Sequence, residues 1–235
     1  MTVVRSLSLP LSLAVLAGCS AGTAGESPNL TATLVSPTDI ALSWHPTEPD
    51  AAGQVVEYAN EEHGDYTILR FAAPDETSYQ HPDLIPRTPF FYRVRPYFGT
   101  ASAAVDVSLP PGDLDESRTD PEDWLKPKTI PGRTAPTVPV RRADAAPTGF
   151  RATVMHANGI RFDWTDRAGD EDGVLLEVRP AGSADFSVAA VLDPDVNSAG
   201  LITLPAEKRA TYRVRAYRYG EPTNIAHQTT GGQPD

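Results

Sequence analysis

The four residues Tyr92-Arg93-Val94-Arg95 recur as Tyr212-Arg213-Val214-Arg215, 120 positions further along the 235-residue chain. Trp44 and Trp164 are separated by the same offset, and each precedes the tyrosine of its own copy by 48 positions. Holding the offset without a gap from residue 30 to residue 98 gives 17 identities in 69 aligned positions, spread over the whole span. A fixed offset of this kind is the mark of an internal repeat. The chain therefore holds two copies of one module.

Each copy has the pattern of short β-strands. Residues 30–35 and 40–44 alternate apolar and polar side chains around a Ser-Pro-Thr-Asp turn, and residues 150–155 and 160–164 do the same around Asn158-Gly159. The repeated arginines alternate with tyrosine and valine, which predicts one packed and one solvated face. No stretch of either copy has a helical period. About seven short strands per copy predict an all-β chain of two tandem immunoglobulin-like β-sandwiches.

Both copies resemble fibronectin type III domains of bacterial extracellular proteins. The resemblance rests on the tryptophans of Leu42-Ser43-Trp44 and Phe162-Asp163-Trp164, and on the late Tyr-Arg-Val strands at residues 92–96 and 212–216. It implies fibronectin type III domains at 28–110 and 146–231. Phe90 and Ala210 stand where the family usually has a corner tyrosine. The sequence therefore predicts that the tyrosine-corner hydrogen bond is missing from both copies.

Residues 111–145 belong to neither copy and form a Pro-rich charged linker with six prolines. Such a composition favours an extended, semi-rigid spacer between the two sandwiches. Trp124 lies at the crossover from its acidic half to its basic half. Because a large apolar ring is costly to expose, we expect Trp124 to pack on one of the copies and to fix their relative orientation. A loosely held ring, or an exposed anchor for a partner or sugar, are the alternatives.

The only cysteine, Cys19, comes directly after a 12-residue apolar run, and that run comes after a single positive charge, Arg5. The run is too short to span a bilayer. Leu16-Ala17-Gly18-Cys19 resembles the bacterial lipobox. The resemblance implies a lipoprotein signal peptide at 1–18, acyl chains on Cys19, a lipidated tether at 19–27, and a protein anchored on the extracytoplasmic side of the cell membrane or outer envelope. The alternative is an ordinary secretory peptide with a chance cysteine. Residues 232–235 are a short tail.

The net charge of −11 argues against nucleic acid as a partner, because phosphate binding needs lysine and arginine. One loop concentrates carboxylates that could hold Ca²⁺ through oxygen ligands, namely Asp166, Asp170, Glu171 and Asp172. The corresponding loop of the first copy lacks this cluster, which favours a solvated turn instead. The five histidines have no metal-ligand spacing, and no motif of a catalytic nucleophile or a phosphate-binding loop is present. We assign no catalytic residue, no cofactor and no metal.

Two modules and a linker leave no room for a catalytic domain, so we expect a protein that is not an enzyme. The expected function is display of the two modules from the envelope, either as a spacer or for adhesion to an unidentified extracellular or envelope protein or glycan. The alternative is an accessory subunit of an extracellular polysaccharide-degrading system, because similar modules in bacteria often accompany glycoside hydrolases.

Overall fold

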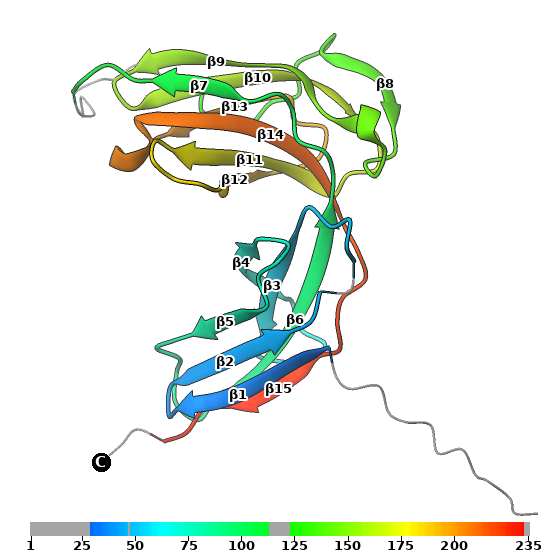
Figure 1. The fold of residues 1–235 in the computed structure, drawn as a ribbon, viewed down its shortest axis with the longest axis vertical. Coiled ribbons are helices and arrows are strands. Elements are labelled where there is room, and N and C mark those ends of the chain that lie inside the picture. The colour runs from blue at the N-terminus through cyan, green and yellow to red at the C-terminus, as the bar shows by residue number, and fades with distance from the viewer. Residues whose placement is uncertain (1–28, 47, 113–122, 233–235) are drawn as a thin grey trace, which may run out of the picture.

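The computed structural model describes residues 29–46, 48–112 and 123–232, and it confirms an all-β chain of two β-sandwiches (Figure 1). In sandwich 1, a three-stranded sheet packs on a four-stranded one. The first sheet holds β1 (Leu30–Ser36), β2 (Asp39–Trp44) and β5 (Ser78–His81); the second holds β3 (Gly53–Ala59), β4 (Thr67–Ala72), β6 (Pro89–Phe98) and β15 (Ala226–Thr229).

Sandwich 2 repeats this arrangement and adds one strand. Its first sheet holds β9 (Thr148–His156), β10 (Gly159–Ala168), β13 (Ser198–Ile202) and the added β8 (Thr134–Val138), which runs parallel to the end of β10. Its second sheet holds β7 (Val105–Ser108), β11 (Gly173–Pro180), β12 (Ser187–Leu192) and β14 (Arg209–Tyr219). The short 3₁₀ helices η1 (Ala143–Ala145) and η2 (Pro205–Glu207) complete the described elements.

Each sandwich has one edge strand that follows the other sandwich's strands in the chain. β7 follows β6 in sequence but pairs with β14, so that Val107 lies opposite Ala210. β15 follows β14 but pairs with β6, so that Ala226 lies opposite Tyr92. Sandwich 2 is thus one continuous segment, residues 105–219. Its first strand in the chain, β7, pairs with its final strand, β14. Sandwich 2 is inserted between β6 and β15 of sandwich 1, which consists of residues 29–98 and 223–232 (Figure 1).

This insertion differs from the boundaries expected from the sequence, 28–110 and 146–231. Those ranges assign residues 105–108 to the first copy and residues 226–229 to the second, whereas the strand pairing places each in the other sandwich. The sequence does not show this exchange because β7 and β15 each have two nearly identical strands with which they could pair. β6 and β14 carry the same Tyr-Arg-Val-Arg sequence, so either one offers the same edge to a short strand, and the alternation within that strand does not choose between them.

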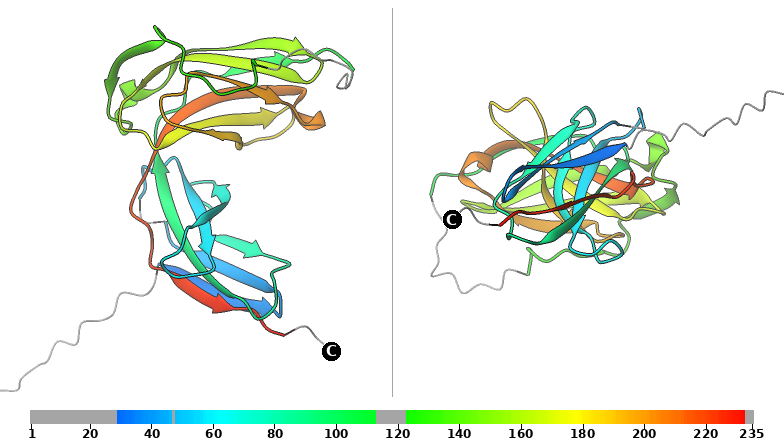
Figure 2. Two further views of the ribbon diagram at one scale, coloured as in Figure 1. Left: turned by 180° about the vertical axis from the view of Figure 1, so that it is seen from behind. Right: turned by 90° about the horizontal axis from the view of Figure 1, so that it is seen from below.

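The second sheets of the two sandwiches, which hold β6 and β14, join at the junction of the sandwiches. Arg218 and Tyr219 at the end of β14 pair with Phe98 and Tyr97 at the end of β6. The result is one continuous path of strands, β12-β11-β14-β6-β3-β4, that runs through both sandwiches. The view from behind shows the two crossing segments, after β6 and after β14, side by side at this waist (Figure 2).

The two cores are built from equivalent residues of the repeat. Trp44, Ile40 and Tyr92 are buried in sandwich 1, as are Trp164 and Tyr212 in sandwich 2. Each fully buried aliphatic or aromatic side chain contributes about 1.5–3 kcal/mol of transfer free energy. The period-2 pattern of the sequence therefore identifies the inward faces correctly, because burial of one face dictates the register of each strand.

The expectation that both copies lack a tyrosine-corner bond is wrong for the second. The hydroxyl of Tyr212 donates to the carbonyl of Glu207, five residues upstream, at 3.0 Å, so the tyrosine of the repeated motif itself supplies a backbone bond across this corner. In sandwich 1 the equivalent Tyr92 hydroxyl lies 3.1 Å from Nδ1 of His81. The hydroxyl of the tyrosine in the repeated motif thus forms a hydrogen bond in both copies.

The linker is not a spacer between the sandwiches. Its described part, residues 123–145, lies along sandwich 2: the Lys128 amide donates to the Ser198 carbonyl at 2.8 Å, and the Gly200 amide donates to the Leu125 carbonyl at 3.1 Å. This segment therefore covers the edge strand β13, and covering an edge is one way in which proteins protect its unpaired backbone groups. The sandwiches are connected instead by residues 99–104 and 220–222.

Candidate binding surfaces and the acidic loop

The junction is closed by aromatic rings placed by the repeat. The Tyr97 and Tyr217 rings meet edge to face with centroids 6.2 Å apart, and both are buried together with Val55 and Leu175. Glycine is required beneath the first ring, because a Cβ on Gly53 would lie 2.4 Å from the Tyr97 hydroxyl oxygen. Aromatic pairs of this geometry contribute about 0.5–1.5 kcal/mol beyond their buried area. The junction is a packed interface rather than a free hinge.

Arg141 adds a second contact across the junction. Its guanidinium lies 3.0 Å from the Asp50 carboxylate and 3.7 Å above the centre of the Phe98 ring. Next to it, Val140 is buried, and its amide donates to Oδ1 of Asp170 at 2.7 Å. The end of the linker therefore buttresses both sandwiches.

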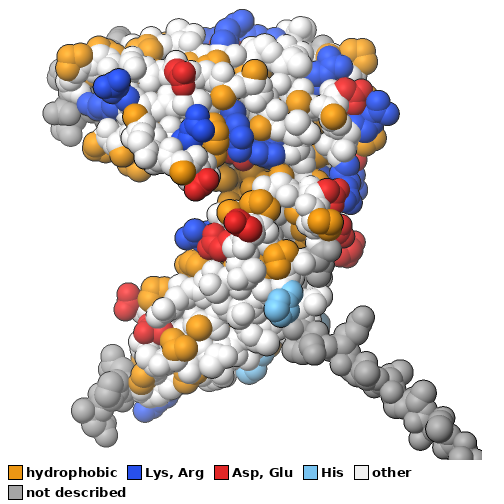
Figure 3. All heavy atoms as spheres, in the orientation of Figure 1, with side chains coloured by type: hydrophobic (Ala, Val, Ile, Leu, Met, Phe, Trp, Pro, Cys, Tyr) orange, Lys and Arg blue, Asp and Glu red, His pale blue; other side chains and the backbone are white. Residues whose placement is uncertain are grey.

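A groove opens on the concave side of the junction, between strands from both sandwiches. Its volume is about 530 Å³, and its walls are residues 68–71 of β4 and 187–191 of β12. These are the two ends of the continuous path of strands. Because consecutive residues of both strands line it, the groove is bounded by strand edges and not by one face of a sheet. Figure 3 shows the molecule hollowed between the two sandwiches.

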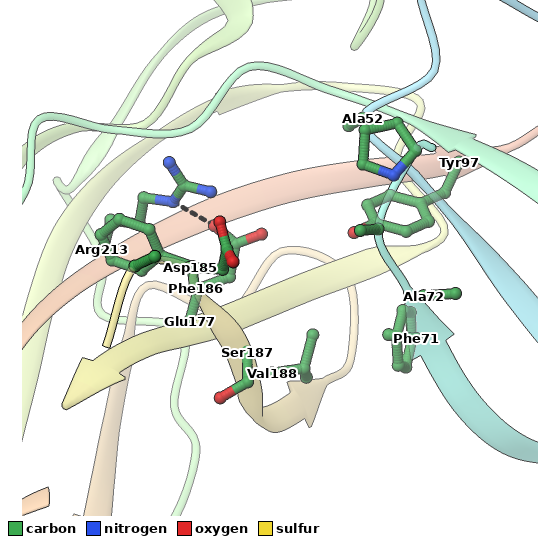
Figure 4. Close-up of a pocket in the computed structure, with 13 residues that line it drawn as sticks. Ala52, Phe71, Ala72, Tyr97, Glu177, Asp185, Phe186, Ser187, Val188 and Arg213 are labelled. Atoms are coloured by element: carbon green, nitrogen blue, oxygen red, sulfur yellow. Dashed lines mark hydrogen bonds and ion pairs between the residues drawn. The ribbon is translucent and has the colours of Figure 1, made fainter. Parts of the chain in front are cut away.

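A smaller cavity of about 300 Å³ adjoins this groove (Figure 4). Phe71 and Tyr97 approach from sandwich 1, and Phe186 and Arg213 from sandwich 2. The Arg213 guanidinium carbon lies 3.9 Å above the Phe186 ring centre, and its Nε also binds Glu177. Arg213 and Glu177 therefore neutralise each other in this cavity, which is typical of a structural junction.

The structure divides the acidic loop into two groups. Asp166 and Glu171 come together, and the carboxylate of Asp195 joins them, with one oxygen of each within 4.8 Å of the others. Asp170 is bound elsewhere, to the Val140 amide and, at 2.6 Å, to Arg218 Nη1. Asp172 accepts from the Tyr219 amide at 2.7 Å. These last two carboxylates hold the loop to the junction, so the four predicted residues do not form a single site.

Asp195 is the member that sequence reasoning missed, because it lies 24 residues beyond Glu171 in the chain. The three carboxylates offer three oxygens of the six to eight that Ca²⁺ takes, so we assign no metal to them. Burial raises the pKa of Asp166 to about 6. The backbone amide bonds that Asp166 accepts lower its pKa, and the negative charges of Glu171 and Asp195 raise it further. Asp166 is only 1% exposed.

We expect Asp166→Asn to stabilise the protein by about 1–3 kcal/mol at pH 7.5. The folded pKa of about 6 lies above the unfolded value of 3.8, so the folded state binds the extra proton and the ionised form opposes folding at higher pH. The amide is neutral at every pH and keeps the oxygen that accepts from the Ala168 amide. Urea unfolding should show the gain at pH 7.5 and its loss at pH 4. An equal gain at both pH values would contradict the assignment.

Trp124 packs on sandwich 2, through positions where only glycine fits. A Cβ on Gly200 or on Gly159 would lie 2.7 Å from atoms of its ring, and the His156 ring meets it edge to face at 5.3 Å. Trp124 is half-buried. The contacts that orient the sandwiches are those of Arg141 and the junction tyrosines, so the expected orienting role of Trp124 does not follow from the contacts of its ring. Cys19 lies outside the described residues.

The strand order defines the class of protein: two immunoglobulin-like β-sandwiches, with three strands packed on four in sandwich 1 and, because β8 is added, four strands packed on four in sandwich 2. No protein-family model matches the chain, and no curated protein matches it. Solved structures that resemble it include a two-domain fibronectin type III segment of chicken tenascin, with 15% identity over 84% of this chain and 97% of that one and a TM-score of 0.27.

Two more structures are similar at the same level. Chicken CNTN1 domains FN1–FN3 show 16% identity over 87% of this chain and 68% of that one, with a TM-score of 0.28. A fibronectin type III domain of human collagen XX shows 20% identity over 30% of this chain and 76% of that one, with a TM-score of 0.26. In the described part of the chain, no helix is long and apolar enough to cross a membrane.

Proposed function

We propose that the protein is a non-enzymatic envelope lipoprotein that holds a binding module away from the membrane. The observation that carries this proposal is that both ends of the described chain belong to sandwich 1. The Leu30 amide donates to the Asn224 side-chain oxygen at 2.9 Å, and the Asn224 side-chain nitrogen donates to the Leu30 carbonyl at 3.0 Å. A tether from Cys19 would therefore lead into sandwich 1, and the inserted sandwich 2 would be the outer module.

The junction supports the same division of roles. Two connections, the paired ends of β6 and β14, and the Arg141 contacts limit how far sandwich 2 can swing relative to sandwich 1. A tethered module that keeps its orientation loses less freedom when it binds a partner. Sandwich 1 serves as the support in this proposal, and sandwich 2 carries the binding surface.

Replacing Cys19 with alanine should release the protein from membranes. A thioether-linked lipid needs the cysteine sulfur, and stable anchoring takes two or more acyl chains. The measurement is membrane fractionation of the producing cells combined with incorporation of labelled palmitate, and Ser20→Ala, which keeps the cysteine, is the matched control. Retention of the Cys19→Ala protein in the membrane fraction would refute the anchor.

A further inference from the structure

The outward face of β9, β10 and β13 in sandwich 2 carries an unusual concentration of positive charge. Arg133 Nη1, Arg161 Nη2 and Arg151 Nε lie 2.5, 3.1 and 3.7 Å from the carboxylate of Asp163. Burial alone would push the pKa of Asp163 up, but hydrogen bonds from Arg161, Ser198 and Arg133 outweigh it and hold the pKa below 3.8. Asp163 therefore stays ionised, and three guanidinium groups share one negative charge.

Strand pairing arranges these groups in two adjacent rows. Asp163 lies opposite Arg151 on β9 and opposite Ser198 on β13. Arg161, two residues earlier on the same face, lies opposite Thr153 and Gly200. Directly opposed Cβ positions are about 4.5–5.5 Å apart, so the Trp124 ring on Gly200 is a neighbour of Arg161. An aromatic ring thus borders the cluster of arginines.

The fold does not require this charge. The repeat places Thr31, Ala41 and Ser43 of sandwich 1 at the positions of Arg151, Arg161 and Asp163, and the equivalent strands pair there with no charged residue at these three positions. Most of the lysine and arginine visible in Figure 3 lies on sandwich 2, although the chain as a whole has a net charge of −11. A cationic face that one copy has and the other lacks points to a ligand rather than to stability.

We propose that this face binds a segment of an acidic polysaccharide, with carboxylate or sulfate groups on Arg151 and Arg161 and a sugar ring on Trp124. Guanidinium groups bind such oxyanions in a bidentate manner, and an aromatic ring offers an apolar surface to the C–H face of a sugar. Arg151 is the most exposed of the three, with 58% of its side chain accessible, and so is free to turn to a ligand. The assignment rests on the proposed function, since it names the ligand class of the outer module.

The test uses the full-length protein in detergent and isothermal titration calorimetry with three tetrasaccharides: tetragalacturonate, chondroitin sulfate tetrasaccharide and neutral maltotetraose. We expect an acidic tetrasaccharide to bind, with affinity that falls as salt rises, and maltotetraose not to bind. Arg151→Ala and Arg161→Ala should each weaken binding at least tenfold, and Trp124→Ala should weaken it severalfold. Arg87→Ala, which removes an exposed arginine of sandwich 1, is the matched control and should change nothing.

Several results would overturn the proposal. These are an absence of binding by both acidic tetrasaccharides, equal binding of maltotetraose, or unchanged affinity in Arg151→Ala with its circular dichroism spectrum intact. Equal binding of a DNA duplex or of anionic phospholipid vesicles, with the same dependence on Arg151, would show charge attraction without recognition of a sugar and would also overturn it. Membrane release by Cys19→Ala is independent of these outcomes, so a failure of the anchor and a failure of the glycan site are distinguishable.

Discussion

A chain that ends at Gly220 should lose the fold of sandwich 1 and keep that of sandwich 2. Removal of residues 221–235 takes away β15, which pairs with β6, and Asn224, which makes two hydrogen bonds to Leu30. β6 would then become an unpaired edge beside an incomplete core. Sandwich 2 keeps every strand, because β7, the edge strand that pairs with β14, lies before the deleted residues.

The tryptophans make this test specific, because Trp44 lies in the core of sandwich 1 and Trp164 in that of sandwich 2. In ¹⁵N-labelled protein, the indole signal of Trp44 should collapse to its unfolded position while that of Trp164 stays dispersed. Deletion of residues 233–235 alone is the control. If the boundaries 28–110 and 146–231 described the folding units, the opposite signal would be lost, and that result would refute the strand exchange.

The local structure was predictable, and the pairing between the halves was not. Trp44, Trp164, Tyr92 and Tyr212 are buried where the alternation of the sequence puts them, because one buried face is enough to set a strand's register. The exchange of β7 and β15 depends on which of two nearly identical partners each strand meets. That choice is made by the path of residues 99–104 and 220–222, which have no periodic pattern of their own.

The candidate sites divide in the same way. Asp166 and Glu171 were identifiable as one loop, whereas Asp195 and Arg133 come from other parts of the chain and meet their partners only after folding. One signal was available for Asp195: it belongs to the Pro-Asp pair that the repeat preserves. No comparable signal exists for Arg133, because the linker has no counterpart in the repeat.

Replacing Glu177 with alanine should cost about 3–5 kcal/mol in the free energy of unfolding, among the largest effects of any single substitution in the described residues. Glu177 is buried, and its Oε1 accepts from Arg215 Nε at 2.9 Å while its Oε2 binds Arg213. Arg215 is itself only 8% exposed. Without Glu177 its positive charge would stay buried without a counter-charge, which is the costly way to break an ion pair.

The repeat supplies the matched control for this prediction. Glu57, the equivalent residue of sandwich 1, binds Arg93 at 2.6 Å, and the Arg93 side chain is 27% exposed. Water can therefore solvate Arg93 after Glu57→Ala, and we expect a cost of about 1–2 kcal/mol. Urea unfolding, followed by the indole ¹⁵N NMR signal of Trp164 for one variant and of Trp44 for the other, measures both. Equal costs would contradict the burial argument.

The same substitution should also loosen the connection between the sandwiches. Arg215 Nη1 donates to the carbonyl of Gly99, the first residue of the crossing segment after β6. Once Glu177 is gone, the guanidinium loses the carboxylate that positions it, and the bond to Gly99 is weakened with it. Hydrogen exchange at residues 99–104 should therefore speed up in Glu177→Ala and stay unchanged in Glu57→Ala, because Glu57 is bonded to Arg93, which lies away from that segment.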